Sequence, residues 1–398
     1  MSHRSLPRIG LLWAQFASYH IDRAEAVGRR FAGGWDVTAV EVATASRTYQ
    51  WQPSGALDAA RKVTLFPGQV YDDIPWHRRL WAQWSALRGC RIVFVGIGYD
   101  QPDILCLGWL LRLTGHRVVM LTDSKFDDRP RWVLREAGKA LLLRCFHAAI
   151  VAGRRQRDFV WMLGFGGRRA ILPGMDTISV ARVRSLAQRE LERPLPFAER
   201  EFVFVGRFVP KKNVLRMIEA YARYAGQAGE AAHGLRLVGA GPLEPAMREL
   251  VDRLGIAERV HFSGFLPDAE VPRVLAGALA LVLVSTEEQW GLVINEAVAL
   301  GVPVITSFPV GAGDALVRSG ENGFLVEAGA VDGIAAAMTQ AASSEALWQR
   351  LSAASAARGW LADADRFADA VEVLVDAPGA ASAAERIGRF EQVLDEAA

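Results

Sequence analysis

Short apolar runs alternate with segments of helical periodicity along most of this chain. The first unit is the clearest, since an apolar run at Arg8 to Trp13 is followed by a polar turn and a helical segment that continues through Phe31. Consecutive apolar residues predict a strand buried on both faces, as in a parallel sheet covered by helices. The predicted fold class is therefore α/β, with doubly wound parallel sheets. Further strands are predicted at residues 37–42, 63–66, 91–95, 118–121, 148–151, 201–205, 235–238, 260–266 and 322–326, and just before residue 285.

The length of the chain predicts two domains, because 398 residues exceed what one hydrophobic core ordinarily holds. Residues 179–200 have no regular pattern and place Pro194 and Pro196 in a charged run, which is typical of an interdomain connection. We expect an N-terminal domain at 1–180, a linker at 181–200 and a C-terminal domain at 201–374. A helix at about 375–398 is expected to pack back onto the N-terminal domain.

Charge divides unevenly between the halves. Residues 1–200 hold 30 Lys and Arg against 18 Asp and Glu, whereas residues 201–398 hold 16 against 26. The basic half also contains nine of the twelve tryptophans. This composition favours contact with anionic lipid headgroups or with a phosphate-bearing acceptor, and an ordinary solvated basic surface is the alternative. No nucleic-acid partner is expected.

The cysteines and the hydropathy pattern indicate the cellular compartment of the protein. Cys90, Cys106 and Cys145 lie in or beside apolar stretches without metal-ligand spacing, which is typical of reduced core residues in a cytosolic protein. The N-terminal apolar run is too short for a secretion signal, and the longest apolar run, residues 274–284, is too short to span a bilayer. Any membrane contact is therefore expected to be peripheral, at the inner face of the plasma membrane.

Residues 285–305 carry the strongest functional signal. Two carboxylates, Glu288 and Glu296, flank the segment Gln289-Trp290-Gly291-Leu292, between an apolar strand and a predicted short helix. A helix that begins near Gly291 would direct backbone N–H groups at an anion, and glycine permits close approach. The two carboxylates would accept hydrogen bonds from hydroxyls on either side of that anion, on a sugar and on a ribose. The stretch therefore predicts a donor-sugar site.

Two cations occupy one predicted strand-to-helix loop of the second half. Arg207 follows the strand at 201–205, and Lys212 precedes Asn213, which is predicted to cap the next helix. Cations at the carboxyl ends of parallel strands suit a diphosphate. A surface role for either lysine in this loop is the alternative.

Glycine-containing turns end the next two predicted strands. The turn Gly239-Ala240-Gly241-Pro242 lacks the third glycine of a dinucleotide fingerprint and predicts close backbone packing beside a ligand. Gly264 and Phe265 follow the strand after it, where Phe265 would stack on a base or, alternatively, join the core.

The first half offers candidates on the acceptor side. Gln15, Tyr19 and His20 lie in or beside the loop after the first strand, and His20 could instead cap the following helix. Asp123 follows the strand at 118–121 and could contact an acceptor or the reacting sugar, or simply be solvated. The helical segment 76–88 combines arginines with tryptophans, which suits either a membrane surface or a crossover helix whose tryptophans face the sheet.

Together these motifs resemble the family 4 glycosyltransferases, retaining enzymes of the GT-B fold with two facing Rossmann-like domains. The resemblance covers about residues 201–330 and has a looser counterpart near residues 150–176. The matching segments are Val205-Gly206-Arg207 with Lys212, Gly239 to Pro242, Phe262 to Phe265, and Glu288 to Glu296 followed by Ala297, Gly301, Pro303 and Val304.

The resemblance implies a metal-independent glycosyltransferase of hexosyltransferase type without a cofactor. Arg207 and Lys212 would neutralise the departing diphosphate, Glu288 would bind the donor sugar and Glu296 the ribose. The C-terminal domain would hold the nucleotide-sugar donor and the N-terminal domain the acceptor, a lipid-linked or saccharide molecule in bacterial-type surface-glycan synthesis. A family histidine near the donor sugar is replaced here by the segment around Asp123, which leaves the acceptor open. A nucleotide-sugar epimerase and a non-catalytic sugar-nucleotide-binding protein are the alternatives.

Overall fold

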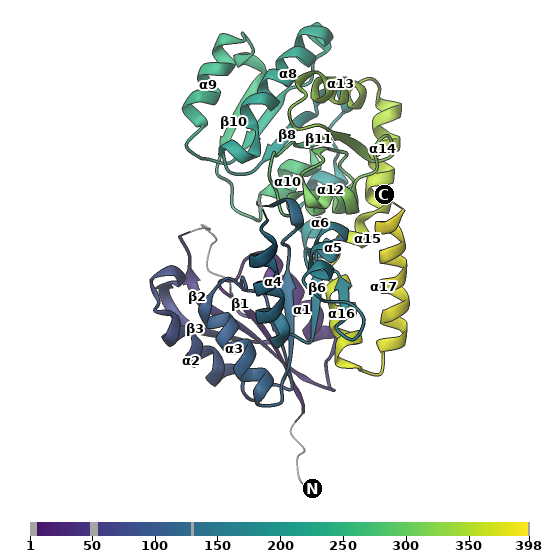
Figure 1. The fold of residues 1–398 in the computed structure, drawn as a ribbon. Coiled ribbons are helices and arrows are strands. Elements are labelled where there is room, and N and C mark those ends of the chain that lie inside the picture. Colours follow the sequence, from purple (N-terminus) through teal and green to yellow (C-terminus); the bar gives the residue numbers. More distant parts are fainter. Residues whose placement is uncertain (1–5, 48–54, 129–130, 397–398) are drawn as a thin grey trace. The chain divides into compact units, whose positions relative to one another are not determined.

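The computed structural model describes residues 6–47, 55–128 and 131–396. The chain divides into two compact units (Figure 1). Unit 1 comprises Met1–Ser179 and Ala364–Gln392, and unit 2 comprises Val180–Asp363 and Val393–Ala398. Each unit is built on one parallel sheet flanked by helices, which confirms the predicted α/β class.

Unit 1 contains a seven-stranded sheet in the order β3-β2-β1-β4-β5-β6-β7, with every pair parallel. The strands are β1 (Arg8–Trp13), β2 (Asp36–Ala45), β3 (Arg61–Val70), β4 (Ile92–Val95), β5 (Arg117–Thr122), β6 (Ala148–Val151) and β7 (Ile171–Pro173). The helices are α1 (Ser18–Arg30), α2 (Trp76–Leu87), α3 (Pro102–Leu113), α4 (Val133–Leu142), α5 (Arg154–Met162), α16 (Asp365–Val375) and α17 (Ala380–Asp395), the last of which ends in unit 2.

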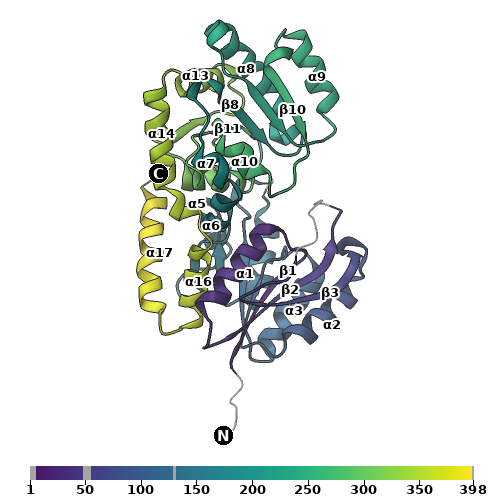
Figure 2. The ribbon, with the colours of Figure 1, turned by 180° about the vertical axis from the view of Figure 1, so that it is seen from behind.

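The unit 1 sheet is buried on both faces, because successive side chains of a strand point to opposite sides. Leu11 belongs to the core layer that α1 and α16 share, whereas Leu12 belongs to the layer beneath α2, α3 and α5. Figure 2 shows α1 and α16 side by side. The continuous apolar run from Ile9 to Trp13 therefore has the burial that the sequence predicts.

Unit 2 contains a six-stranded parallel sheet in the order β10-β9-β8-β11-β12-β13. The strands are β8 (Glu201–Val205), β9 (Leu235–Val238), β10 (Val260–Gly264), β11 (Ala278–Leu283), β12 (Val304–Ser307) and β13 (Gly323–Val326). The helices are α6 (Val180–Leu186), α7 (Gln188–Glu192), α8 (Val214–Ala228), α9 (Glu244–Arg253), α10 (Val271–Ala276), α11 (Val293–Ala299), α12 (Gly311–Leu316), α13 (Val331–Ala341), α14 (Glu345–Ala357) and α15 (Gly359–Ala362).

The strand order of unit 2 brings two loops together. In unit 2 the first strand, β8, lies between β9 and β11, so the order reverses there. Ligands of open α/β sheets bind at such switch points, outside the carboxyl ends of the strands. The loops after β8 and β11 are thus brought together although the segments are far apart in sequence.

After unit 2, the segment Ala364–Gln392 returns to unit 1. Phe367 and Val371 of α16 are fully buried in the same core layer as Trp13, and the rings of Trp13 and Phe367 are 6.4 Å apart. Arg30 of α1 is ion-paired with Asp369 at 2.8 Å. Residues 365–374 were predicted in the C-terminal domain and residues 181–200 in a linker, whereas α16 lies in unit 1 and residues 180–200 lie in unit 2.

Two local predictions hold only in part, and the first concerns Asn213, which occupies the N-cap position of α8 without capping the helix through its side chain. Asn213 precedes α8 in the left-handed region, with φ of 59°, and its side chain makes no capping hydrogen bond. Its Nδ2 instead donates to the carbonyl oxygens of Val284 and Ala328, at 3.0 and 2.6 Å, which ties α8 to the ends of β11 and β13. Of the two alternatives for residues 76–88, the crossover helix holds only in part, because Trp84 packs against the core of unit 1 whereas Trp76 and Trp81 are exposed.

Candidate functional site

The loops after β8 and β11 are connected by the backbone and by one ion pair. Thr286 N–H donates to the carbonyl oxygen of Lys211 at 2.8 Å. Next to this contact, Lys212 Nζ and Glu288 Oε2 form an ion pair. The two side chains are mostly buried, with 13% and 16% of their surfaces exposed. The structure therefore brings together two of the predicted catalytic residues at the switch point of the unit 2 sheet.

Glu288 is held from several directions. Ser285 Oγ donates to Glu288 Oε2 at 3.4 Å, and the Glu288 backbone pairs with Val310 in the loop after β12. Arg207 follows β8 in the same loop as Lys212 and is exposed. A mostly buried carboxylate beside a cation, with a second, exposed cation in the same loop as the first, suits a ligand with hydroxyls next to negative charge.

The segment between the two predicted carboxylates forms a fixed turn. Trp290 is 4% exposed, and its Nε1 donates to Asn295 Oδ1 at 2.9 Å. Gly291 has a φ of 102°, and a Cβ there would lie 3.1 Å from Leu283 and 3.2 Å from Val310. Trp290 thus anchors the turn from inside, while the neighbouring Gln289 is exposed.

The helix after this turn is shorter than an anion-binding helix usually is. Leu292 stands at its N-cap position, and α11 then runs only from Val293 to Ala299. Glu296 lies in its first turn and is partly exposed. Since seven residues add little macrodipole, the cations Arg207 and Lys212 are the better counterparts for an anion here.

The glycine turns of unit 2 pack backbone against backbone, as predicted. A Cβ on Gly239 would lie 1.9 Å from the carbonyl oxygen of Gly206, and one on Gly241 would lie 2.5 Å from that of Phe208. Gly239 N–H donates to the carbonyl oxygen of Gly264 at 2.8 Å, so the loops after β8, β9 and β10 are joined. Phe265 follows with 59% of its surface exposed, which excludes the alternative of a core side chain.

In unit 1 the loop after β1 is built around His20. Its Nδ1 accepts the Ala17 backbone N–H at 3.0 Å, so His20 caps α1, which was the structural alternative. Burial, followed by the nearby Arg23, holds the pKa of His20 well below its usual value, so the ring is neutral at pH 7. Tyr19 is partly exposed, and its ring lies tilted against that of His20 with the centroids 4.3 Å apart. Gln15 is buried, and its Nε2 donates to the carbonyl oxygen of Thr44 at 3.0 Å.

A pair of carboxyl groups lies beyond this loop. Asp123 directly follows β5, and Asp176 follows β7. Burial, followed by the charge of Asp176, raises the pKa of Asp123 to about 7. Burial also raises the pKa of Asp176, although Arg23 opposes this by donating to its Oδ1 at 3.1 Å. Asp123 is therefore a carboxyl group able to hold or release a proton near neutral pH.

Two buried residues that hold the loops of unit 1 were not identified from the sequence. Arg23 and Asp176 were not assigned a role, although Arg23 is fully buried in α1 and links α1 to the loop after β7. Arg23 lies on the buried face of a predicted helix, three residues after His20. A charged side chain at such a position could have indicated a paired carboxylate. The predicted residues form two groups, one in each unit.

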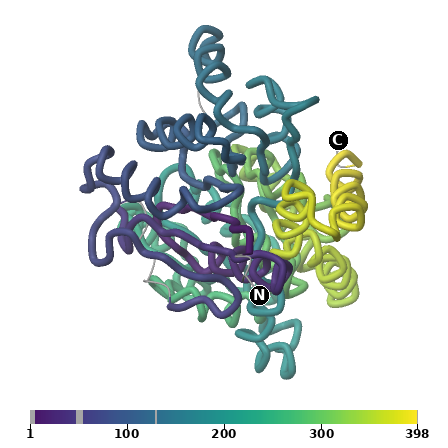
Figure 3. Tube along the Cα trace, turned by 90° about the horizontal axis from the view of Figure 1, so that it is seen from below, coloured from purple at the N-terminus to yellow at the C-terminus, as the bar shows by residue number. Residues whose placement is uncertain are grey.

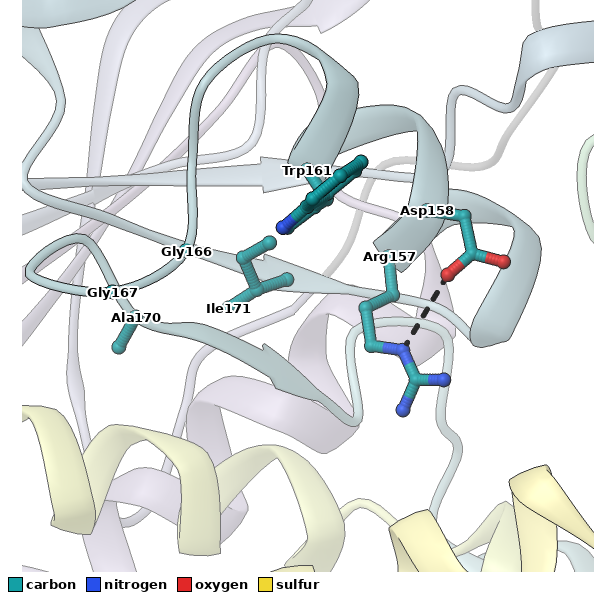
Figure 4. A pocket seen from close by; sticks show the side chains of 7 residues that line it. All are labelled: Arg157, Asp158, Trp161, Gly166, Gly167, Ala170 and Ile171. Atoms are coloured by element: carbon teal, nitrogen blue, oxygen red, sulfur yellow. Dashed lines mark ion pairs between the residues drawn. The ribbon is translucent and has the colours of Figure 1, made fainter.

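The hollows of unit 1 lie apart from these residues. One pocket of about 440 Å³ lies between α5 and the edge strand β7 (Figure 4). Trp161 and Ile171 line it, and Arg157 is ion-paired with Asp158 at its mouth. A second hollow of about 530 Å³ is lined by residues such as Arg8 and Trp35. Neither hollow includes a predicted site residue.

Within residues 6–47, 55–128 and 131–396, the structure has no cluster of three or more His, Cys, Asp or Glu side chains placed to hold a metal ion. In the same part of the chain, no helix has both the length and the apolar character needed to cross a bilayer.

Comparison with known proteins identifies the second half most clearly. Residues 188–358 match the family model described as glycosyl transferases group 1. The lipopolysaccharide core biosynthesis glycosyltransferase LpsE of Rhizobium meliloti is 32% identical over 187 residues, which are 47% of this chain and 52% of LpsE. The 2-deoxystreptamine N-acetyl-D-glucosaminyltransferase of Streptomyces fradiae is 32% identical over 224 residues, 55% of this chain and 51% of that protein. The chain thus spans about half the length of these curated relatives.

Solved structures match nearly the whole chain. The match to HepE of Anabaena, in complex with UDP and glucose, covers 93% of this chain and 99% of the HepE chain, with a TM-score of 0.67 and 15% identity. WaaG, a glycosyltransferase involved in lipopolysaccharide biosynthesis, covers 92% and 99%, with a TM-score of 0.60 and 15% identity. These likenesses establish the fold, which is GT-B with two parallel-sheet, Rossmann-like units, as predicted.

Proposed function

We propose that this chain is a retaining glycosyltransferase of hexosyltransferase type, because residues 188–358 match the family model of the group 1 glycosyl transferases. The donor is a nucleotide-diphosphate sugar. The observation that carries the proposal is the Lys212–Glu288 ion pair at the switch point of the unit 2 sheet. It presents a cation and a sugar-binding carboxylate side by side, which is what the junction of a diphosphate and a sugar requires.

The proposed roles follow the charges. Arg207 and Lys212 neutralise the diphosphate as it leaves, and preorganised cations stabilise such developing charge without reorganising. Glu288 accepts hydrogen bonds from donor-sugar hydroxyls, and Glu296, on the first turn of α11, accepts those of the ribose. The exposed ring of Phe265 stacks on the base. Gly206, Gly241, Gly264 and the turn at Gln289 to Leu292 supply close-lying backbone.

Donor binding changes the partners of Lys212. In the structure its ammonium is paired with Glu288, so a bound diphosphate adds a second anion to a cation that is already held in place. Glu288 then keeps Lys212 oriented while its remaining lone pairs face the sugar. Acceptor attack on the same face as the departing diphosphate retains the anomeric configuration, and catalysis rests on positioning and electrostatics.

The acceptor is proposed to be a lipid-linked or saccharide molecule, used in surface-glycan or exopolysaccharide synthesis at the cytoplasmic face of the membrane. The name of the similar protein LpsE, in lipopolysaccharide core biosynthesis, supports this class of acceptor. Tyr19 and Asp123 are the proposed acceptor-side contacts, since both are partly exposed near the carboxyl ends of unit 1 strands. The buried Gln15 and His20 shape the loop behind them.

One experiment tests the donor assignment. Thermal unfolding of the full chain is followed with a panel of nucleoside diphosphates and nucleotide sugars, because a ligand bound only by the folded state raises the melting temperature. One base is expected to give a rise of several degrees that Lys212→Ala abolishes. No rise with any member of the panel would overturn the proposal.

A second measurement separates the reaction classes. The nucleotide sugar that stabilises the protein is incubated with and without saccharide and lipid-linked acceptors, and with or without EDTA. Transfer that needs an acceptor and resists EDTA is expected. Conversion of the nucleotide sugar without acceptor would instead indicate an epimerase, and binding without any conversion would indicate a non-catalytic protein.

A further inference from the structure

Helix α4 has its apolar face turned outward. The one residue of α4 that is buried is the charged Glu136, whereas Val133, Leu134 and Leu141 are 86%, 89% and 58% exposed. Trp132, immediately before the helix, is 72% exposed. Helices of globular proteins normally bury the apolar stripe and expose the charges, so this arrangement is the reverse of the usual one. Figure 3 shows α4 projecting from the edge of unit 1.

The inward side of α4 is fixed by charges. Glu136 Oε1 accepts from Lys139 Nζ at 2.8 Å and lies 3.7 Å from Arg131. The Arg131 guanidinium in turn lies over the Phe159 ring of α5 at 4.2 Å and donates to the carbonyl oxygen of Phe126 at 3.0 Å. These contacts fix the rotation of α4 about its axis. The leucines therefore point outward in the folded protein.

The outward residues share one side of the helix. Val133, Ala137 and Leu141 are spaced by four residues, and Leu134 lies beside Leu141 on the side farthest from Glu136. Exposed Arg135 lies next to this stripe, and exposed Arg144 follows the end of the helix. We call Trp132, Val133, Leu134, Ala137, Leu141, Arg135 and Arg144 the α4 surface. Clustered exposed apolar side chains with polar flanks mark an interaction site.

We propose that the α4 surface docks unit 1 onto an anionic lipid bilayer, with Trp132 and the leucines entering the headgroup boundary. Charge complementarity selects this occupant, since residues 131–144 hold four cations, Arg131, Arg135, Lys139 and Arg144, against the single carboxylate of Glu136. An apolar stripe flanked by arginines, with a tryptophan at its end, suits the boundary between headgroups and acyl chains. A second copy of the same positive surface would be repelled by the first.

The other tryptophan-bearing helix fits a bilayer less well. In α2 the exposed Trp76 and Trp81 are five residues apart, so they point about 140° from each other around the helix and form no single stripe. On α4 the apolar residues share one side. The membrane contact expected from the sequence therefore belongs to α4 rather than to residues 76–88.

This membrane contact rests on the proposed function at the cytoplasmic face of the membrane. It is tested by vesicle binding and not by turnover. The full chain is floated with vesicles of phosphatidylcholine, with or without phosphatidylglycerol, at low and high salt. Binding to the anionic vesicles that weakens with salt is expected. Leu134→Ser/Leu141→Ser is expected to weaken binding at least tenfold, and Arg135→Gln/Arg144→Gln to remove the preference for phosphatidylglycerol.

Trp81→Ser on α2 is the matched control, because it removes an equally exposed apolar side chain from another helix. It is expected to bind like the unmodified protein, and all variants are expected to unfold at the same temperature, since every substituted side chain is exposed. Equal binding by the leucine variant, or loss of binding in Trp81→Ser, would overturn the assignment. Dimers that the leucine substitutions dissociate, without vesicle binding, would identify a second copy as the occupant. Failure of nucleotide to stabilise the protein would refute only the proposed donor site.

Discussion

Lys212 and Glu288 are ion-paired although 76 positions separate them in the sequence. They follow β8 and β11, which are adjacent and parallel at the point where the strand order of unit 2 reverses. The Thr286–Lys211 backbone hydrogen bond holds the two loops in register beside the pair. The sheet topology therefore creates a cation-carboxylate pair that neither loop contains alone.

Removing either member of this pair should lower turnover sharply. Lys212→Ala and Glu288→Gln are each expected to reduce kcat about a hundredfold, which is typical for loss of one preorganised group. Steady-state transfer with the identified donor measures this. Lys211→Ala is the control, because Lys211 is 41% exposed and pairs with the exposed Glu287 at 3.7 Å. A loss of similar size in Lys211→Ala would show that the loop, and not the pair, matters.

Asp123 should make stability depend on pH. Its pKa of about 7 in the folded chain lies above the usual carboxyl value, so the folded state holds a proton that the unfolded state releases. This contribution to stability is present below about pH 4 and is lost as the pH rises through 7. The melting temperature of Asp123→Asn is therefore expected to change less between pH 5 and 8 than that of the unmodified protein. The variant should be stabilised most, relative to the unmodified protein, at pH 8.

Asp158→Asn, at a side chain that is 63% exposed, provides the comparison for this pH series. It should reproduce the unmodified slope. Parallel curves for Asp123→Asn and the unmodified protein would show that Asp123 does not titrate in this range.

Asn213 should stabilise unit 2 through its amide and its backbone. Asn213→Gly keeps the left-handed φ but leaves the buried carbonyls of Val284 and Ala328 without this donor, at a cost of about 1–3 kcal/mol. Asn213→Ala adds about 1 kcal/mol of backbone strain at φ of 59°. Urea denaturation measures both free energies of unfolding. Equal stability of the glycine variant and the unmodified protein would contradict the account.

Phe265 should contribute to nucleotide affinity without contributing to the fold. Because the ring is 59% exposed, Phe265→Ala is expected to leave the melting temperature of the unliganded protein unchanged. Loss of base stacking should weaken binding of the nucleoside diphosphate about tenfold in calorimetry, and Phe265→Tyr should retain it. Leu254→Ala, at an exposed residue after α9, should bind normally. Unchanged affinity in Phe265→Ala would remove the stacking role.

Much of the fold was predictable because most of its strands are continuous apolar runs. The predicted run at Arg8 to Trp13 is β1 in full. Strand β7 was not predicted as such, since it has three residues, ends in Pro173 and is only partly buried at Ile171. Periodicity also cannot tell which way an amphipathic helix faces. The stripe of α4 predicts burial, whereas the Glu136 cluster turns it outward.

The residues of the candidate site were predicted more readily than their interactions. Spacing placed Lys212 and Glu288 in loops of the right kind, but the pairing depends on strand order, which local sequence does not encode. The polar type of Asn213 suggested a cap, yet its partners are carbonyl oxygens from two distant strands. The pKa of Asp123 is raised by burial and by the charge of Asp176, which is 53 positions away in the sequence.

The return of residues 364–392 to unit 1 affects how the protein can be made and divided. The unit 1 core includes Phe367, Val371 and Ile387, so it stays incomplete on the ribosome until nearly the whole chain has been synthesised. Most of unit 2 can fold before that point. A fragment ending at residue 179 would expose the apolar side of α1 and aggregate. Chimaeras that exchange unit 1 among relatives must therefore carry both of its segments together.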